Sequence, residues 1–482
     1  MSDAPLNMAQ VQHRVALELQ RIGPVIEELG ARFSAAGEEL ALVGGPVRDA
    51  MLGRLQQDLD FATTARPEVT EKILRGWADH IWDVGRAFGT IGCRRDDWLV
   101  EVTTYRAEAY DRSSRKPTVT YGDSLVEDLR RRDFTVNAMA VRLPEKTFED
   151  PFGGIVDLAH RVIRTPGRPE DSFSDDPLRM MRAARFAAQL AFTVDPAVVA
   201  AMTDMADRIQ IISAERVRDE LIKLVCAPYP RLGLHLLVET GLAAIVLPEL
   251  PALALERDEH NRHKDVYEHT LTVLEQTIDL EHRLGDEPDF VARFAALMHD
   301  VGKPRTRRFL GDGTVTFHHH DVVGAKLTRK RMQALKFPTD VIDAVAKLVE
   351  LHLRFHGYGS GEWTDSAVRR YVRDAGDELP RLHVLTRADC TTRNRRKAER
   401  LRRTYDDLEA RIERLSAAEE LASIRPDLDG HQIMEILGVG PGRQVGEAYS
   451  FLLELRLDNG PMSTEEATAA LTQWWAERTA GC

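Results

Sequence analysis

The sequence has few cysteines and no long run of apolar residues. Its four cysteines, Cys93, Cys226, Cys390 and Cys482, show no paired spacing, which argues against a disulfide framework and favours a reducing compartment. No apolar stretch approaches the roughly 20 residues that span a bilayer, and the first residues lack the basic and then apolar segments of a secretory signal. We therefore expect a cytoplasmic protein without a membrane anchor.

The chain also lacks an excess of positive charge. Its formal net charge is −12, which excludes a protein that coats nucleic acid non-specifically. Arginines nevertheless cluster in "DLRRRDF", in "GKPRTRRFL" and across residues 381–403. Local contacts with phosphate are therefore compatible with the acidic total, although many of these arginines are expected on solvated helix faces.

The length of 482 residues exceeds what one core supports, so we expect two to four domains. Strand-like alternation up to about residue 157 predicts a mixed α/β domain, and Ala/Leu/Arg-rich periodicity after it predicts helices to the end of the chain. The expected parts are an N-terminal helix over 1–34, an α/β head over 35–165, a helical neck and body over 166–255, an all-α domain over 256–404 and a helical tail over 405–482.

An aspartate pair stands out in "GGPVRDAMLGRLQQDLDFAT", residues 44–63. On a strand, Asp58 and Asp60 point to the same side, where two carboxylates are costly without a cation. Magnesium accepts carboxylate oxygens together with substrate phosphates, and a two-ion site activates a hydroxyl and neutralises the departing diphosphate. Gly44 and Gly45 allow backbone amides to approach a triphosphate at a helix start. The pattern predicts phosphate transfer, with a helix-capping or arginine-binding acid pair as the structural alternative.

Several motifs point to one family: "LVGGPVRDAMLGR…DLDFAT", "EDLRRRDFTVNAMA", "DPFGGIVDLAHRVIRT" and "DDPLRMMRAARF". In this order they resemble the class II tRNA nucleotidyltransferase and bacterial poly(A) polymerase family over about residues 35–250. The resemblance implies a polymerase-beta-like nucleotidyltransferase head, an all-α neck and body, Mg²⁺ as cofactor, and tRNA, CTP and ATP as partners. It gives no indication of oligomeric state.

The resemblance also implies roles for the metal ligands and the triphosphate site. Gly45 and Arg48 look like the triphosphate-binding turn, Asp58 and Asp60 like the magnesium ligands, and Glu101 in "WLVEVTTYR" like the third carboxylate.

Two further elements imply contacts with the nucleotide. Arg132, Asp133 and Asn137 match the "RRDFTxNA" element, which in the family touches phosphate and ribose. Asp176 and Arg179, one helical turn apart, match the pair that hydrogen-bonds the base edge, and Arg182 and Arg185 continue that face; the alternative is an intrahelical salt bridge. One departure is Asp175, where the family has Glu.

The choice between CCA addition and poly(A) addition depends on two segments. Residues 84–93, "VGRAFGTIGC", lack the basic continuation of Gram-negative poly(A) polymerases and look more like the CCA-adding pattern. Residues 108–129 resemble the flexible loop with which CCA-adding members switch from CTP to ATP. We therefore expect addition of CMP, CMP and AMP to the tRNA 3′ end with release of diphosphate. A poly(A) polymerase and a non-catalytic tRNA-binding module are the alternatives.

A histidine set follows in "DVYEHTLTVLE", "FAALMHDVGKP", "TFHHHDVVGAKL", "ELHLRFH" and "LTRADCT". Over about residues 260–395 it resembles an HD-type metal phosphohydrolase. An adjacent His-Asp at the end of an apolar helix binds one ion from two directions, while other ligands arrive from separate helices. The expected ligands of a divalent ion of unknown identity are His269, His299, Asp300 and Asp389, with His320 and His352 for a second ion and His318 and His319 at the surface.

The ion at this histidine set is either structural or hydrolytic, so a phosphohydrolase activity beside the transferase stays open. A signalling phosphohydrolase with a regulatory nucleotidyltransferase head is a further alternative, although the tail shows no β-rich sensor region. In the tail, the glycine-rich turn from Gly438 to Gly442 either holds a nucleic-acid phosphate or connects two helices. Ser463 with Glu466 predicts a capping box for a last helix that ends in a core-packed tryptophan pair.

Overall fold

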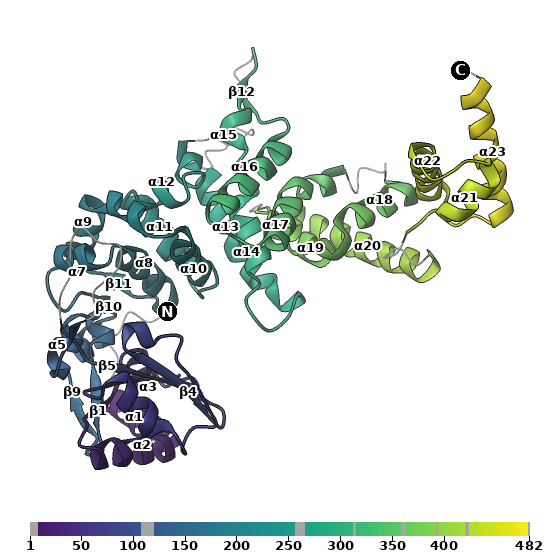
Figure 1. Ribbon diagram of the computed structural model, residues 1–482. Coiled ribbons are helices and arrows are strands. Elements are labelled where there is room, and N and C mark those ends of the chain that lie inside the picture. The colour runs from purple at the N-terminus through teal and green to yellow at the C-terminus, as the bar shows by residue number, and fades with distance from the viewer. Residues whose placement is uncertain are drawn as a thin grey trace. The chain divides into compact units, whose positions relative to one another are not determined.

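The computed structural model describes residues 8–107, 120–255, 266–311, 315–357, 363–391, 394–419 and 424–480 (Figure 1). The chain divides into two compact units, Met1–Val246 and Leu247–Cys482. Among the described helices, none is long and apolar enough to cross a membrane.

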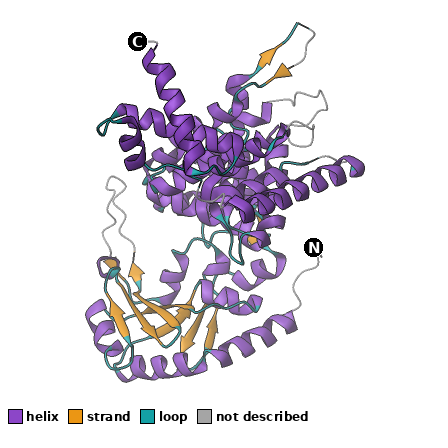
Figure 2. Ribbon diagram, turned by 90° about the vertical axis from the view of Figure 1, so that its right-hand side faces the viewer, coloured by secondary structure: helices purple, strands orange, loops and turns teal. Residues whose placement is uncertain are grey.

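The first unit begins with a seven-stranded mixed sheet, drawn in orange in Figure 2, with the strand order β3-β4-β5-β2-β1-β8-β9. Only β2 and β5 pair in parallel; the other neighbours are antiparallel. All four residues of β1, "LALV", are buried, as expected for a central strand. The strands are β1 (Leu40–Val43), β2 (Asp58–Thr63), β3 (His80–Trp82), β4 (Thr90–Arg95), β5 (Trp98–Thr104), β8 (Ala140–Leu143) and β9 (Thr147–Glu149), with a small pair of β6 (Arg106–Ala107) and β7 (Thr120–Tyr121) beside them.

Helices pack on this sheet through apolar stripes. In α2, Val25, Ile26, Leu29 and Phe33 are buried at helical spacing. The helices of this region are α1 (Met8–Arg21), α2 (Gly23–Ala35), α3 (Gly45–Leu52), α4 (Pro67–Leu74), α5 (Leu125–Arg130) and α6 (Gly154–His160). The single N-terminal helix expected over 1–34 is therefore two helices, because Pro24 fixes its own φ and lacks an amide donor, so it begins a new helix.

The neck is built around α8, which packs between α10 and α11. Its helices are α7 (Pro169–Asp175), α8 (Leu178–Leu190), α9 (Pro196–Asp204), α10 (Ala214–Val225), α11 (Pro230–Glu239) and α12 (Leu242–Val246), and a short parallel pair joins β10 (Val162–Ile163) to β11 (Thr193–Val194). The Ser213 side chain caps α10 by accepting from the Arg216 amide. The predicted α/β head is confirmed, and the neck that follows it is mostly helical, interrupted only by the short strand β11 among its described residues.

The second unit is helical around α14 (Phe290–Met298), whose residues 292–298 are all buried against α13, α17 and α19. Its other helices are α13 (Val266–Leu280), α15 (Lys303–Thr306), α16 (His320–Ala334), α17 (Thr339–Leu351), α18 (Asp365–Ala375), α19 (Leu379–Ala388), α20 (Arg395–Glu419), α21 (Gly430–Leu437), α22 (Arg443–Asn459) and α23 (Thr464–Ala480). One hairpin, β12 (Arg308–Phe309) with β13 (Val315–Thr316), interrupts the expected all-α pattern.

Short 3₁₀ helices connect several of these elements: η1 (Arg86–Phe88), η2 (Thr135–Asn137), η3 (Ala206–Ile211), η4 (Pro251–Leu255), η5 (Glu281–Arg283), η6 (Arg354–Gly357) and η7 (Gly376–Glu378). In the tail, Phe451 of α22 stacks on Trp474 of α23 with ring centroids 5.0 Å apart. Ser463 and Glu466 form the predicted capping box, with reciprocal bonds of 3.2 and 2.9 Å.

Candidate active site and metal centre

The predicted carboxylates lie on neighbouring strands of the head. Asp58 and Asp60 alternate along β2 with the buried Leu59 and Phe61, so both face the same side. Strands β2 and β5 pair in parallel, and their register places Asp60 directly opposite Glu101. Burial, together with repulsion from Glu101 and Asp58, raises the pKa of Asp60 from 3.8 to about 6, although Arg132 opposes the change. Hard oxygen donors that repel one another suit a magnesium ion, which removes this repulsion.

The turn before α3 has space only for glycine. Gly44 has a φ of 75°, and a Cβ there would lie 2.6 Å from Nη1 of Arg132. The Gly44 amide donates to the Met139 carbonyl at 3.2 Å, so it belongs to the backbone of the head. Both glycines still line the cavity described below, and Gly45 is the first residue of α3, so the prediction that this turn lets the backbone approach a triphosphate stays a prediction.

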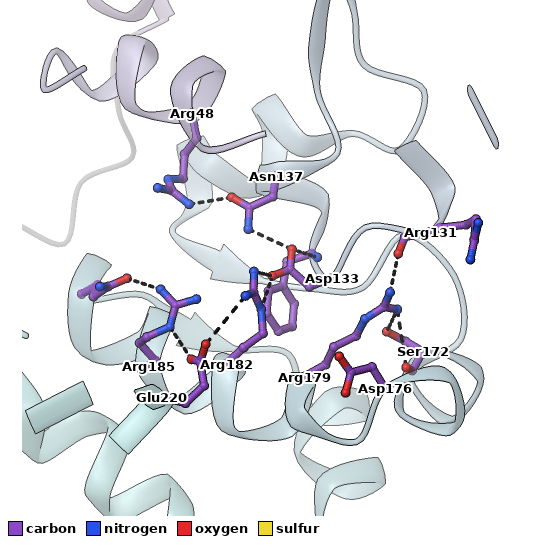
Figure 3. A network of polar contacts seen from close by, with 12 residues as sticks. Arg48, Arg131, Asp133, Asn137, Ser172, Asp176, Arg179, Arg182, Arg185 and Glu220 are labelled. Carbon is purple, nitrogen blue, oxygen red and sulfur yellow. Dashed lines mark hydrogen bonds and ion pairs between the residues drawn. The ribbon is translucent and has the colours of Figure 1, made fainter. Parts of the chain in front are cut away.

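A chain of polar contacts connects α3 to the neck (Figure 3). Arg48 donates from Nη1 to Oδ1 of Asn137 at 2.6 Å, and Asn137 donates from Nδ2 to Oδ1 of Asp133 at 2.9 Å. Arg182 of α8 binds the other oxygen of Asp133, with its Nε 2.8 Å away. Although burial acts in the opposite direction, the Arg182 charge and the bonds from Asn137 and Arg182 hold the pKa of Asp133 well below its usual range.

The chain continues to an acid that the sequence analysis missed. Glu220 of α10, 4% exposed, accepts from Nε of Arg185 at 2.6 Å and lies 3.7 Å from Nη1 of Arg182. One carboxylate thus serves two arginines of α8, the buried Arg185 and the partly exposed Arg182. The signal in the sequence was the spacing of Arg216, Glu220 and Lys223, which places three charged residues on one face of α10.

The predicted base-reading pair has a geometry different from the expected one. Asp176 lies before α8, because Pro177 separates it from the first helical residue, and its Oδ1 accepts from the Leu178 amide at 3.1 Å. Its Oδ2 lies 2.7 Å from Nη2 of Arg216. Asp176 and Arg179 are therefore not two residues within one helix, and each has another partner instead of the alternative intrahelical salt bridge.

Arg179 points toward Ser172 and Arg131 in Figure 3. Its Nη1 donates to Oγ of Ser172 at 2.8 Å, and its Nη2 donates to the Arg131 carbonyl. Both acceptors are neutral, whereas Arg182 and Arg185 bind carboxylates.

One cavity of about 630 Å³ brings these groups together. It contains every predicted nucleotide-site residue and both aspartates of β2, whereas Glu101 is not in its lining. The lining also includes residues that the sequence analysis did not select. Its full lining is Gly44, Gly45, Arg48, Asp58, Asp60, Arg131, Arg132, Asp133, Asn137, Asp176, Arg179, Arg182, Arg185, Phe186, Arg216 and Lys223. With eight basic and four acidic residues in that lining, the cavity has the charge that a triphosphate requires.

The second unit gathers the predicted histidine set at helix ends. His299 follows α14, His320 begins α16, His352 follows α17 and Asp389 follows α19, while His269 lies within α13. The Nδ1 atoms of His299, His320 and His352 lie 2.8, 2.8 and 2.6 Å from backbone carbonyls three residues earlier. These bonds assign the proton to Nδ1 and leave Nε2 as the atom available to an ion.

These Nε2 atoms provide the test of whether a metal fits. Those of His299 and His320 are buried without a hydrogen bond, and they lie 3.2 and 3.4 Å from the two oxygens of Asp300. Burial of unpaired acceptors beside a carboxylate is costly unless a cation lies between them. Burial lowers the pKa of His352 to about 3, which favours the neutral imidazole that binds metals.

The ligand groups divide differently from the prediction. One group is His269, His299 and Asp389, and the other is Asp300, His320 and His352, with the ligand atoms of each within 4.8 Å of one another. Asp300, expected with the first group, is grouped by these distances with His320 and His352.

Oδ2 of Asp300 is still 3.7 Å from Nε2 of His269, so this carboxylate lies between the two groups and suits a bridging role. Lys303, which the sequence analysis did not select, pairs with the same oxygen at 2.8 Å. His318 and His319 are exposed, as expected.

The structure describes two further predicted segments, the flexible loop and the glycine-rich turn of the tail, to different extents. Most of the predicted flexible loop, residues 108–119, lies outside the described residues. The turn from Gly438 to Gly442 connects α21 to α22, and a Cβ at Gly438, Gly440 or Gly442 would meet no atom within 4 Å. That turn is therefore open to solvent.

Comparison with known proteins agrees with the two-site arrangement. Residues 40–164 match the family model of the poly A polymerase head domain, residues 191–253 match a probable RNA- and SrmB-binding site of polymerase A, and residues 266–394 match the HD domain. An A-adding tRNA nucleotidyltransferase of Deinococcus radiodurans is 35% identical over 92% of this chain and 96% of its own length. The chain belongs to the tRNA nucleotidyltransferase family. The predicted family and its HD domain are thereby confirmed.

Other family members differ in how much of this chain they match. A CC-adding tRNA nucleotidyltransferase of Thermus thermophilus is 31% identical over 91% of this chain and 94% of its own length. A CCA-adding enzyme of Levilactobacillus brevis is 41% identical, over 48% of this chain and 56% of its own. Among solved structures, the Bacillus stearothermophilus CCA-adding enzyme in complex with CTP has a TM-score of 0.64 at 27% identity, covering 96% of this chain and 99% of that one.

Proposed function

We propose that this tRNA nucleotidyltransferase adds CMP, CMP and AMP from CTP and ATP to the 3′ end of tRNA. The observation that carries the proposal is the single cavity in which the aspartates of β2, the glycine turn and the arginines of α8 meet. Membership of the family supports it, as does the solved CCA-adding enzyme with CTP bound. A tRNA substrate agrees with the expected cytoplasmic location.

In the proposed reaction the terminal ribose oxygen of the tRNA attacks the α-phosphorus of the nucleotide. The bond from that phosphorus to the diphosphate breaks, and the hydroxyl proton passes to solvent. Asp58, Asp60 and Glu101 hold magnesium, which when bound activates the hydroxyl and neutralises the triphosphate. Arg48 and Arg132 add fixed positive charge at the leaving diphosphate. Positioning and charge neutralisation then supply the catalysis.

Base selection rests on Asp176 and Arg179. Each oxygen of Asp176 keeps a lone pair after its contact with Leu178 or Arg216, so the carboxylate still accepts from the amino group of cytosine or adenine. Arg179 donates to a ring acceptor once it exchanges its neutral partners for the base. On their Watson–Crick edges, guanine and uracil lack this combination of an amino donor beside a ring-nitrogen acceptor.

Partial addition is the second candidate function. The A-adding and CC-adding relatives match this chain over nearly its whole length, while the CCA-adding relative of Levilactobacillus brevis matches about half of it. Against this candidate, the chain carries the whole sequence of the proposed flexible loop, residues 108–129. Residues 84–93 argue against the poly(A) alternative, as stated above.

For the HD domain we propose two divalent ions, each held by one of the three-ligand groups, with Asp300 between them. A phosphohydrolase activity toward phosphate esters follows if both ions leave a position for water. Elemental analysis of the purified protein would identify the divalent metal that is bound.

The deciding experiment offers CTP and ATP, separately and together, to one tRNA that lacks its last three nucleotides and to one that ends in CC. Growth by two cytidines and one adenosine followed by arrest supports the proposal. Arrest after CC, or addition of A only to the tRNA that ends in CC, identifies partial addition, and long adenosine tails identify a poly(A) polymerase.

A variant pair connects this activity to the carboxylates. Asp58→Ala removes a proposed magnesium ligand and should abolish incorporation in a folded protein. Asp83→Ala removes an acid of the same head whose side chain is 67% exposed, outside the cavity lining, and should leave incorporation unchanged. Retained activity of purified Asp58→Ala would overturn the assignment.

A further inference from the structure

Helix α20 has charges of opposite sign in its two halves. Its first nine residues, "RRKAERLRR" from Arg395 to Arg403, contain six basic residues and one acid. The remaining residues, 404–419, contain five acids and two arginines. The two halves therefore serve different purposes, and their contacts show how.

The C-terminal half docks the helix on its domain. Arg387 of α19 lies 2.8 Å from Asp406 and 3.0 Å from Glu409. The Tyr405 hydroxyl donates to the Thr386 carbonyl at 2.5 Å. Asp406 and Glu409 of this half are thus used in contacts within the second unit.

The N-terminal half presents its charges to solvent. Tyr405, Leu408 and Ile412 are buried and mark the seam by which α20 packs on its domain. The six basic side chains lie off this seam, and all are exposed. Within the part of the chain that the structure describes, none of the six forms an ion pair. We call this set the α20 basic face: Arg395, Arg396, Lys397, Arg400, Arg402 and Arg403.

Contacts inside the molecule do not account for the α20 basic face. The positive end of a helix macrodipole favours acids in the first turn, and α20 has none there. Elsewhere in the second unit, partly exposed arginines such as Arg329, Arg370 and Arg411 are paired with acids. A group of cations that repel one another, placed at the end of a helix that disfavours them, calls for an external polyanion.

We propose that the α20 basic face binds the phosphate backbone of the tRNA substrate. The proposal rests on the proposed function, because it takes its partner from that reaction. Arginine matches phosphate oxygens with two parallel donors, and Arg396, Arg400 and Arg403 form one stripe at spacings of four and three residues. Contacts with the phosphate backbone add affinity but do not depend on the RNA sequence. An enzyme that acts on many different tRNAs requires contacts of this kind. An acidic protein thereby holds RNA through one local surface.

The test uses the full chain and the triple variant Arg396→Ala/Arg400→Ala/Arg403→Ala. Fluorescence anisotropy gives the Kd for a labelled tRNA that lacks its 3′ end, from 50 to 200 mM salt. Each phosphate contact contributes roughly 0.7–0.9 to the slope of log K against log salt, so the slope should become shallower by about 2–3. Kd at about 100 mM salt should rise about tenfold or more, while CMP addition at saturating tRNA stays within about twofold, as expected for contacts outside the reacting atoms.

A matched control removes three exposed arginines that are already paired with acids. The partners are Glu28, Glu71 and Glu447, and the control variant is Arg32→Ala/Arg75→Ala/Arg478→Ala, for which Kd and slope should equal those of the unchanged protein.

Three results would overturn the inference: a triple variant indistinguishable from the control, a loss of affinity for heparin without a loss for tRNA, or a shallower slope in the control as well. An unchanged protein that binds tRNA through this face but adds no nucleotide would instead refute the proposed function alone.

Discussion

The raised pKa of Asp60 leads to a quantitative prediction about metal binding. In the metal-free protein, burial and the neighbouring carboxylates raise this pKa to about 6. A metal ion must displace the proton, so its apparent affinity is proportional to the deprotonated fraction of Asp60. That fraction is about ten in eleven at pH 7 and about one in eleven at pH 5. The affinity of the head for a divalent ion should therefore fall about tenfold between pH 7 and pH 5, or about 1.4 kcal/mol.

Electron paramagnetic resonance of free Mn²⁺ measures this binding directly. The titration is best made in the Asp300→Ala background, because that carboxylate lies between both ligand groups of the HD domain. Asp60→Asn in the same background should bind Mn²⁺ more weakly. Its affinity should also lose the roughly tenfold change between pH 7 and pH 5 that we attribute to Asp60. An affinity that is equal at pH 5 and pH 7, or a dependence that survives in Asp60→Asn, would refute the reasoning.

The same shift has a consequence for folding, with a definite sign. Asp60 holds its proton more tightly in the folded chain than in the unfolded chain, where its pKa is near 3.8. Folding therefore takes up a proton between about pH 4 and pH 6, and this group makes the metal-free protein more stable as the pH falls through that window. Added Mg²⁺ should oppose the trend, because it stabilises the folded protein most where Asp60 is ionised.

The other predictions concern Glu220 and the HD domain. Glu220→Ala leaves Arg185, whose side chain is 9% exposed, without its carboxylate; loss of one partner of a buried pair costs about 3–5 kcal/mol, so we expect a lower Tm and a raised KM for CTP and ATP, and an unchanged Tm would contradict the network. Gly302→Ala puts a Cβ 2.0 Å from the carbonyl oxygen of His320, a proposed metal ligand. The metal content of the purified protein should therefore fall. Gly311→Ala, where no atom lies within 4 Å of the added Cβ, should keep its metal; equal metal content in both would show that the close approach is unimportant.

The local features of the site could be predicted from the sequence because they depend on periodicity. Alternation in β2 places Asp58 and Asp60 on one side, and the sheet register then brings Glu101 opposite Asp60. The histidine set was likewise visible from its residue types and their order, and His299, His352 and Asp389 each directly follow a helix.

The rest depends on contacts between elements far apart in the chain. Glu220 lies 35 residues after Arg185, and its charge is explained only when α10 packs against α8. The position of Asp176 outside α8 follows from Pro177, whereas its contact with Arg216 could not be predicted from spacing. The assignment of Asp300 to the group of His320 and His352 likewise needed the approach of three helix ends, which no local pattern encodes.

The polar network indicates how a protein can read a base without a template strand. Asp133 accepts from Arg182, Asn137 and the Phe134 amide, so both of its oxygens are occupied inside the protein. Arg179 differs, because its partners are a hydroxyl and a backbone carbonyl, and hydrogen bonds to neutral acceptors are about half as strong as those to carboxylates. In the proposed reaction Arg179 is therefore the arginine that exchanges its partners for a base at least cost, while the ion-paired arginines keep the frame fixed. In that proposed reaction, selectivity between nucleotides would come from a small movement of the Arg179 side chain, while Asp133 keeps its contacts with Arg182 and Asn137.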